Sequence, residues 1–203
     1  GKMKKKEITL VIADIRSFKG RDEEILPQIA PQYVEKYHRH KNPVDKTQEL
    51  VAGYLLKQYL GVGKEDELTK NAHGKPLLTF GEKYFNLSHS GNYVALALAE
   101  NEVGVDIEQV RRYHEATARR VFDETTYHKL QMLSGEARDR KFTELWTKLE
   151  AKLKFRGTGF GERLKKEQLD GGGTVTLLVS GDCYVSCAAD HLTDCDQIDV
   201  IYI

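Results

Sequence analysis

The amino-acid sequence predicts an α+β fold built from two halves of about equal size. Short runs of β-branched and aromatic residues, bounded by Gly and Asp, alternate with longer segments whose apolar residues recur at helical spacing. The same broad order, helical segments followed by strands, occurs in both parts of the chain. A chain of 203 residues also has the length of one large domain or of two small ones packed together.

The first half is taken as residues 3–101. Its predicted elements are a strand at residues 8–13, a helix at residues 45–59 and a strand at residues 93–99. We expect Asp45 to cap the helix, with Gln48 bonding back to its first turn. A polar turn then leads into the apolar residues 103–107, which predicts a β-hairpin.

The second half is taken as residues 102–203. Its predicted elements are helical segments at residues 115–133 and 140–155, followed by strands at residues 174–179, 183–189 and 197–202. Cys183 and Cys187 fall on one face of a predicted strand, so we expect them to serve packing.

The composition argues against several classes of function. Lys plus Arg and Asp plus Glu each number 31, so no net charge draws the chain to nucleic acid or to an anionic membrane. No apolar run approaches the roughly 20 residues of a membrane helix, and the run after the basic start is too short for a signal-peptide core. Three cysteines without Cys-x-x-Cys spacing favour a reduced, cytoplasmic compartment.

The first candidate site is the pair Asp106 and Glu108. A strand period of two places both acids on one face, about 7 Å apart along the strand. Two carboxylates at a strand end can share a hard cation such as Mg²⁺. A solvated strand end is the plain alternative, because Asp-x-Glu is a weak pattern.

The second candidate is Glu150 with Lys154, at the margin of the apolar face of the predicted helix. That face consists of Phe142, Leu145, Trp146, Leu149 and Leu153. Partial desolvation at such a margin can make an acid and a base reactive. The alternative is an ordinary Glu–Lys pair of a helix surface.

The third candidate is the segment at residues 85–91 (FNLSHSG), preceded by Gly74-Lys75-Pro76. Hydroxyl, imidazole and ammonium groups together suit a phosphate ligand. Adjacent Ser88 and His89 on a strand point to opposite faces, so they do not form a hydrolase dyad. A polar loop that feeds a strand is the alternative interpretation.

Together these regions resemble the 4′-phosphopantetheinyl transferases of the surfactin type. The motifs that carry the resemblance are Gly74-Lys75-Pro76, FNLSHSG at residues 85–91, GVDIE at residues 104–108, WTKLEAKLK at residues 146–154 and Gly157-Thr158-Gly159. The resemblance spans residues 31–160, with a looser match to the end of the chain. It implies two pseudo-twofold-related α+β halves with the active site in the cleft between them, and hence a monomer.

The resemblance implies transfer of 4′-phosphopantetheine from coenzyme A to a serine of an apo acyl or peptidyl carrier protein, releasing adenosine 3′,5′-bisphosphate. By motif position, Asp106, Glu108 and Glu150 would hold Mg²⁺. Asp106, Glu150 and Lys154 would be the catalytic residues. Glu150 would take the serine proton, directly or through water, and Lys154 would neutralise or protonate the departing bisphosphate.

The resemblance also assigns contacts to coenzyme A. These are Lys36, Gly74, Lys75, Pro76, Ser88, His89 and Lys154. Ser88 and His89 would meet the 3′-phosphate, and Gly74, Lys75 and Pro76 would line the adenine and phosphate region.

This chain departs from the family pattern at three places. Leu149 stands where Lys is usual, Thr126 stands where Glu is usual, and Gln48 followed by Glu49 stands where Arg is usual. Loss of the Arg removes a bidentate phosphate partner, and Glu49 adds a negative charge. These departures leave a binding module without catalysis as an alternative function.

Two further interpretations follow from charge. A metal-dependent nuclease would suit the acids, but the chain offers it no basic groove for a polyanion. Carrier proteins of this class usually present acidic helices, so the basic cluster of Arg111, Arg112, Arg119 and Arg120 is a candidate docking surface, with a solvated helix face as its alternative.

Overall fold

The computed structural model describes residues 4–158 and 173–203. The helices are α1 Asp22–Ile25, α2 Pro31–Arg39, α3 Pro43–Leu60, α4 Glu115–Val121, α5 Glu124–Gln131 and α6 Gly135–Arg156. The strands are β1 Ile8–Asp14, β2 Leu68–Lys70, β3 Pro76–Leu78, β4 Tyr84–Ser90, β5 Tyr93–Ala99, β6 Gly104–Gln109, β7 Thr174–Val179, β8 Cys183–Ala188 and β9 Ile198–Tyr202. The predicted α+β class is confirmed, and α2 is a helix that the sequence analysis does not predict.

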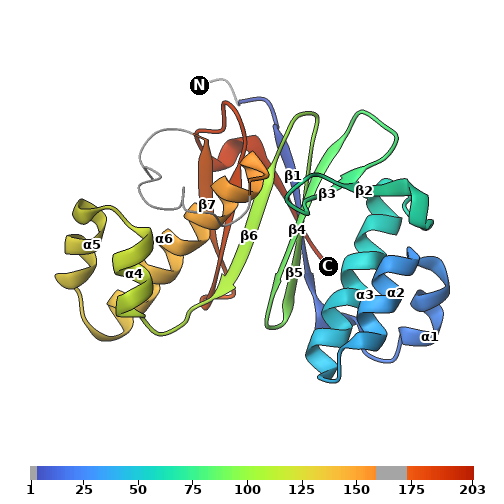
Figure 1. Cartoon of the computed structure of the whole chain (residues 1–203), viewed down its shortest axis with the longest axis horizontal. Helices are drawn as coiled ribbons and strands as arrows, with labels where there is room; N and C mark the ends of the chain where they lie inside the picture. Colours follow the sequence, from blue (N-terminus) through green and yellow to red (C-terminus); the bar gives the residue numbers. More distant parts are fainter. Residues whose placement is uncertain (1–3, 159–172) are drawn as a thin grey trace.

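One sheet has the strand order β4-β5-β1-β9, in which β1 is antiparallel to β5 and parallel to β9. Helices α1 to α3 cover one of its faces (Figure 1). Val11, Val94 and Leu96 on that face are fully buried in one apolar cluster with Leu50 and Leu55 of α3. This burial follows from the strand period of two, which sends alternate apolar residues to the helices.

A second sheet has the order β6-β8-β7, and α6 lies across it (Figure 1). Its inner face packs against the remaining face of the first sheet, where Leu10 and Ala95 meet Val105, Ile107 and Cys187 in a shared core. The structure is therefore layered, with helices α1 to α3, two sheets and helix α6 in succession.

The predicted hairpin between residues 93–99 and 103–107 is wrong. β5 pairs with β4 and β1, whereas β6 pairs with β8 in the other sheet. The chain therefore crosses between sheets at the turn. A polar turn between two apolar runs is a local signal, and it does not say which sheet the second run joins.

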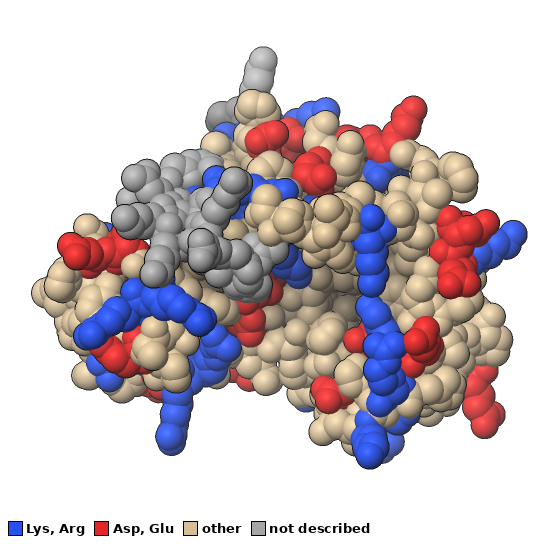
Figure 2. Space-filling model, in the orientation of Figure 1, with Lys and Arg blue, Asp and Glu red and all other residues tan. Residues whose placement is uncertain are grey.

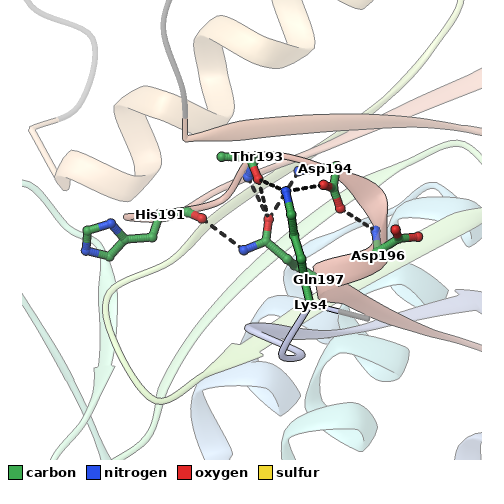
Figure 3. A network of polar contacts seen from close by, with 6 residues as sticks. All are labelled: Lys4, His191, Thr193, Asp194, Asp196 and Gln197. Atoms are coloured by element: carbon green, nitrogen blue, oxygen red, sulfur yellow. Dashed lines mark hydrogen bonds and ion pairs between the residues drawn. The ribbon is translucent and has the colours of Figure 1, made fainter. Parts of the chain in front are cut away.

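The segment before β9 is held by the buried side chain of Gln197 (Figure 3). Its Oε1 accepts hydrogen bonds from the backbone N–H groups of Thr193 (2.7 Å) and Asp194 (3.1 Å), and its Nε2 donates to the His191 carbonyl (2.9 Å). Lys4 forms an ion pair with Asp194. β9 then joins β1 in the first sheet, and the division of the chain at residue 101 stays a prediction.

The predicted cap of α3 is also wrong. Asn42 caps the helix, because its Oδ1 accepts from the backbone N–H of Val44 at 2.8 Å, and Pro43 occupies the first turn. Gln48 does not bond back to the helix start. Its Nε2 donates instead to the carbonyl of Gly91 at 2.8 Å, beyond the end of β4.

Candidate functional site

The site is built where β4 of the first sheet meets β6 of the second. Alternate side chains of β4 accept hydrogen bonds from alternate backbone N–H groups of β6. The pairs are Val105 N to Asn86 Oδ1 (2.8 Å), Ile107 N to Ser88 Oγ (3.1 Å) and Gln109 N to Ser90 Oγ (3.0 Å). These bonds satisfy the edge of β6 and fix the face that carries Asp106 and Glu108.

Three carboxylates converge at this junction. Asp106 and Glu108 of β6 and Glu150 of α6 each offer an oxygen within 4.8 Å of the others. The prediction that Asp106 and Glu108 share a face is confirmed, since Val105 and Ile107 occupy the core on the opposite face. The oxygens lie closer than the strand spacing alone predicts, because the side chains converge.

Burial perturbs two of these carboxylates, Asp106 and Glu108. Asp106 is only 3% exposed, its Oδ1 accepts from the Ser88 hydroxyl at 3.2 Å, and among residues 4–158 and 173–203 its buried Oδ2 finds no hydrogen-bond partner. Burial, reinforced by the charges of Glu150 and Glu108, raises the pKa of Asp106 well above its usual value. Burial and the charge of Glu150 also raise the pKa of Glu108. A buried carboxylate oxygen without a partner, facing two more carboxylates, fits a hard divalent cation.

Lys154 lies one helical turn beyond Glu150 on α6. Its Nζ donates to the carbonyl of Leu87 on β4 at 2.7 Å. Burial lowers the pKa of Lys154, and the charges of the three carboxylates oppose that shift. The ammonium group is therefore held between β4 and the acidic cluster.

A cavity of about 370 Å³ opens beside this group. Its lining residues are His73, Gly74, Lys75, Pro76, Asn86, Leu87, Glu150, Leu153, Lys154 and Gly157. The structure therefore brings the predicted residues Gly74, Lys75 and Pro76 to the same cavity as Glu150 and Lys154. Gly159 of the last predicted motif lies outside the described residues.

The predicted phosphate contact Lys75 is engaged with protein groups. Its buried ammonium donates to the carbonyl of Val103 at 2.9 Å and pairs with Glu102. Burial lowers the pKa of Lys75, while Glu102 opposes the shift. Lys75 thus ties the loop before β3 to the start of β6.

Asn71 is a site residue that sequence reasoning misses. Its Oδ1 accepts from the backbone N–H groups of His73 (2.9 Å) and Lys75 (3.0 Å). Its Nδ2 donates to the carbonyl of Gly157 at 3.0 Å, at the end of α6. An Asn just before a Gly turn signals a local Asx turn, but no local pattern signals the contact with residue 157.

The other face of β4 carries a second group of ionisable side chains. As predicted, His89 points away from Ser88, and its Nε2 lies 3.7 Å from Oε1 of Glu49 on α3. His40 Nε2 lies 3.6 Å from the same oxygen. Partial burial lowers the pKa of His89, against the charge of Glu49. The Lys36 ammonium lies over the ring of Tyr33, 4.9 Å from its centroid.

Leu149, one of the departures from the family pattern, has a structural role, whereas the contact of Thr126 involves only its backbone. Leu149 is fully buried in the cluster that joins α6 to α4 and α5. The backbone N–H of Thr126 donates to the Asp123 side chain at 2.7 Å, which caps α5. The neighbouring Lys148 pairs with Glu144 at 3.7 Å.

The basic cluster is exposed. Arg111 lies over the ring of Trp146 at 5.0 Å, and Arg119 pairs with Glu115 at 3.2 Å. Arg112 and Arg120 are exposed as well. Figure 2 shows basic side chains on both sides of a central hollow on this face.

Comparisons with known proteins confirm the resemblance that the motifs predict. A family model described as the 4′-phosphopantetheinyl transferase superfamily matches residues 102–188, which include all three carboxylates. In the part of the chain that the structure describes, none of the helices has both the length and the apolar character needed to cross a membrane.

Curated relatives give the same result. The chain is 29% identical over 155 residues to 4′-phosphopantetheinyl transferase gsp of Aneurinibacillus migulanus, covering 74% of this chain and 65% of that protein. It is 32% identical over 149 residues to putative 4′-phosphopantetheinyl transferase slr0495 of Synechocystis, covering 68% and 61%. It is 28% identical over 144 residues to 4′-phosphopantetheinyl transferase Sfp of Bacillus subtilis, covering 68% and 64%. The matched region thus spans somewhat less than two thirds of each relative.

Proposed function

We propose, from the similarity to the 4′-phosphopantetheinyl transferase superfamily, that this chain transfers 4′-phosphopantetheine from coenzyme A to a serine hydroxyl of an apo acyl or peptidyl carrier protein. A bond forms between the serine oxygen and the pantetheine-bearing phosphorus. The pyrophosphate bond breaks, and adenosine 3′,5′-bisphosphate leaves. The observation that carries the proposal is the carboxylate cluster with its unpartnered Asp106 oxygen beside the cavity.

Asp106, Glu108 and Glu150 would hold a Mg²⁺ ion, which the donor set supports because Mg²⁺ prefers oxygen ligands. Bound there, the ion would neutralise charge on the coenzyme A pyrophosphate. Paramagnetic resonance of Mn²⁺ as a substitute tests this assignment, and a Glu108→Gln variant that binds Mn²⁺ as tightly as the original would refute it.

Glu150 and Lys154 have the placement for proton and charge transfer. The Glu150 carboxylate lines the cavity and would accept the serine proton, directly or through a water molecule. Lys154 is held by the Leu87 carbonyl and would stabilise negative charge on the departing bisphosphate. Both roles come from side chains one helical turn apart.

Coenzyme A would occupy the cavity, with Gly74, Lys75 and Pro76 against its adenine and phosphate region. His89 and Lys36 would meet the 3′-phosphate. Ser88, the other residue proposed there, accepts from Ile107 N and donates its one hydroxyl proton to Asp106, so that proton would have to turn from Asp106 to a phosphate oxygen.

The carrier protein would dock on the basic cluster through an acidic helix. Reversing the charges of Arg111 and Arg112 should raise the carrier KM, and Arg112 alone should do so without changing the coenzyme A KM, because both guanidinium groups are exposed outside the cavity and, of the two, only the charge of Arg111 acts on Glu108. Steady-state kinetics at two salt concentrations measures this effect. An unchanged carrier KM would refute the docking surface.

The chain would act as a cytoplasmic monomer without nucleic-acid or membrane partners. Its zero net charge supports the last two points, and its three cysteines without Cys-x-x-Cys spacing support a reducing compartment. Ultracentrifugation tests the monomer.

The test of the reaction is chromatographic detection of adenosine 3′,5′-bisphosphate from coenzyme A, Mg²⁺ and apo carrier, with a chelator control. Release that depends on carrier and metal supports the transferase. Coenzyme A binding seen by calorimetry, without release of adenosine 3′,5′-bisphosphate, would favour the binding module. That is the second candidate function, because Gln48 and Glu49 stand where the family usually has Arg.

A further inference from the structure

The group formed by His40, Glu49 and His89, termed the Glu49 cluster, lies on the opposite face of β4 from Ser88 and the acidic cluster. Three segments of the chain contribute to it. His40 lies between α2 and α3, Glu49 belongs to α3 and His89 belongs to β4. One oxygen of Glu49 lies 3.6 Å from His40 Nε2 and 3.7 Å from His89 Nε2. A single carboxylate therefore faces both imidazoles.

The three side chains differ in exposure. Glu49 is 10% exposed, whereas His40 and His89 are 39% and 41% exposed. The carboxylate forms the floor of the cluster, and the imidazoles form a rim that an incoming ligand can reach.

Other charges also act on His89. The charges of Lys154 and Lys36 lower its pKa, and those of Glu49 and Asp45 raise it. The two imidazoles, together with the charge of Lys36 that acts on His89, suit a phosphoryl ligand. The Glu49 carboxylate disfavours such a ligand. A phosphate bound beside His89 would lie close to that carboxylate, and the two negative charges would repel.

The charge of Glu49 reaches its other neighbours as well. It helps to raise the pKa of the buried Tyr33 phenol, whose burial is the larger cause. Glu49 is thus an internal counter-anion for the two imidazoles, a role that a phosphate bound beside His89 would otherwise fill.

We propose that Glu49 sets the donor selectivity of this protein, so that 3′-dephospho-coenzyme A serves as a phosphopantetheine donor about as well as coenzyme A. The inference rests on the proposed function. The same bonds form and break with either donor, and adenosine 5′-monophosphate leaves when the 3′-phosphate is missing. Glu49→Gln removes the negative charge with little change of shape and should restore a preference for the 3′-phosphate.

The test compares kcat/KM for the two donors by the mass of a carrier protein. The selectivity ratio is kcat/KM for coenzyme A divided by kcat/KM for 3′-dephospho-coenzyme A. For the original protein this ratio should lie within about threefold of one, and Glu49→Gln should raise it roughly tenfold through a lower KM for coenzyme A. Glu35→Gln is the matched control, because Glu35 on α2 is 72% exposed and pairs with Arg39. Its ratio should match that of the original protein.

A Glu49→Gln ratio within about twofold of the original value would overturn the inference. So would a preference for coenzyme A of more than about thirtyfold in the original protein, a readout that needs no variant. Calorimetric titration with each donor separates this failure from failure of the proposed function. No transfer from either donor to any carrier would refute the transferase, while equal binding of the two donors would still support the role of Glu49.

Discussion

At the residue scale, the buried carboxylate of Asp106 links the stability of the protein to the proposed metal binding. Its pKa is raised by burial and by two neighbouring carboxylates. An acid whose pKa is higher in the folded than in the unfolded chain contributes most to stability below the unfolded pKa of about 3.9. That contribution is lost as the pH rises toward the folded pKa.

Asp106→Asn should therefore stabilise the metal-free protein at neutral pH and above. We expect the unfolding midpoint to rise by about 2 °C or more at about pH 8, with a smaller difference at about pH 4. The variant should also lose the increase in midpoint that Mg²⁺ gives the original protein. Scanning calorimetry with and without Mg²⁺ measures both effects, and Asp199→Asn on the exposed surface of β9 is the control. A lower midpoint for Asp106→Asn at about pH 8 would contradict this account.

Asn71 is the residue whose loss should loosen the cavity wall. Asn71→Ala removes three hydrogen bonds and leaves the N–H groups of His73 and Lys75 without that acceptor. We expect a stability loss of about 1–3 kcal/mol and weaker coenzyme A binding. Urea unfolding and calorimetry measure these effects, with Asn101→Ala in the exposed turn before β6 as the control. Full stability in Asn71→Ala would show that the loop does not depend on this side chain.

At the element scale, the contact between β6 and α6 depends on Gly104. A Cβ atom at residue 104 would lie 2.2 Å from the Ala151 carbonyl oxygen and 2.4 Å from the Phe155 backbone nitrogen. These are backbone atoms of α6, so the helix itself would have to move. The close approach is what brings Glu150 to Asp106 and Glu108.

Gly104→Ala should destabilise the protein by about 3 kcal/mol or more and weaken metal binding. Gly20→Ala is the control, since Gly20 has a φ of +80° but no atom within 4 Å of an added Cβ. That variant should lose only about 1–2 kcal/mol, from backbone strain. Chemical denaturation measures both variants, and equal losses would mean that α6 is not tightly packed on β6.

The elements differ in how far the sequence predicts them. Residues 103–107 were expected as a strand with Asp106 and Glu108 on one face, and period-two alternation suffices for that. The predicted hairpin is wrong because the pairing of β6 with β8 goes with the packing of Gly104 against α6. That contact joins residues 47 positions or more apart in sequence, which no local pattern shows. The cap of α3 was misplaced because Asn42-Pro43 and Asp45 both carry start signals.

At the scale of the whole molecule, the candidate site lies where the two sheets meet. β4 supplies Ser88 and Asn86, β6 supplies Asp106 and Glu108, and α6 supplies Glu150 (Figure 1). The motif order predicts Ser88, Asp106, Glu108 and Glu150 as site residues, whereas the contact of Asn86 with Val105 is seen only in the fold. The sequence shows no sign of the contacts of Asn71 with Gly157 and of Glu49 with His89, because these partners are distant in sequence, and it marks Glu49 only as an added negative charge.

Intact-mass spectrometry of apo carrier proteins, incubated with this protein, coenzyme A and Mg²⁺, is the direct test of phosphopantetheine transfer at the carboxylate cluster. We expect a gain of one phosphopantetheine per carrier, abolished by chelator and by a folded Glu150→Gln variant. A gain that persists in Glu150→Gln would contradict the role of the carboxylate cluster. No gain on any carrier, with coenzyme A still bound, would contradict the transferase.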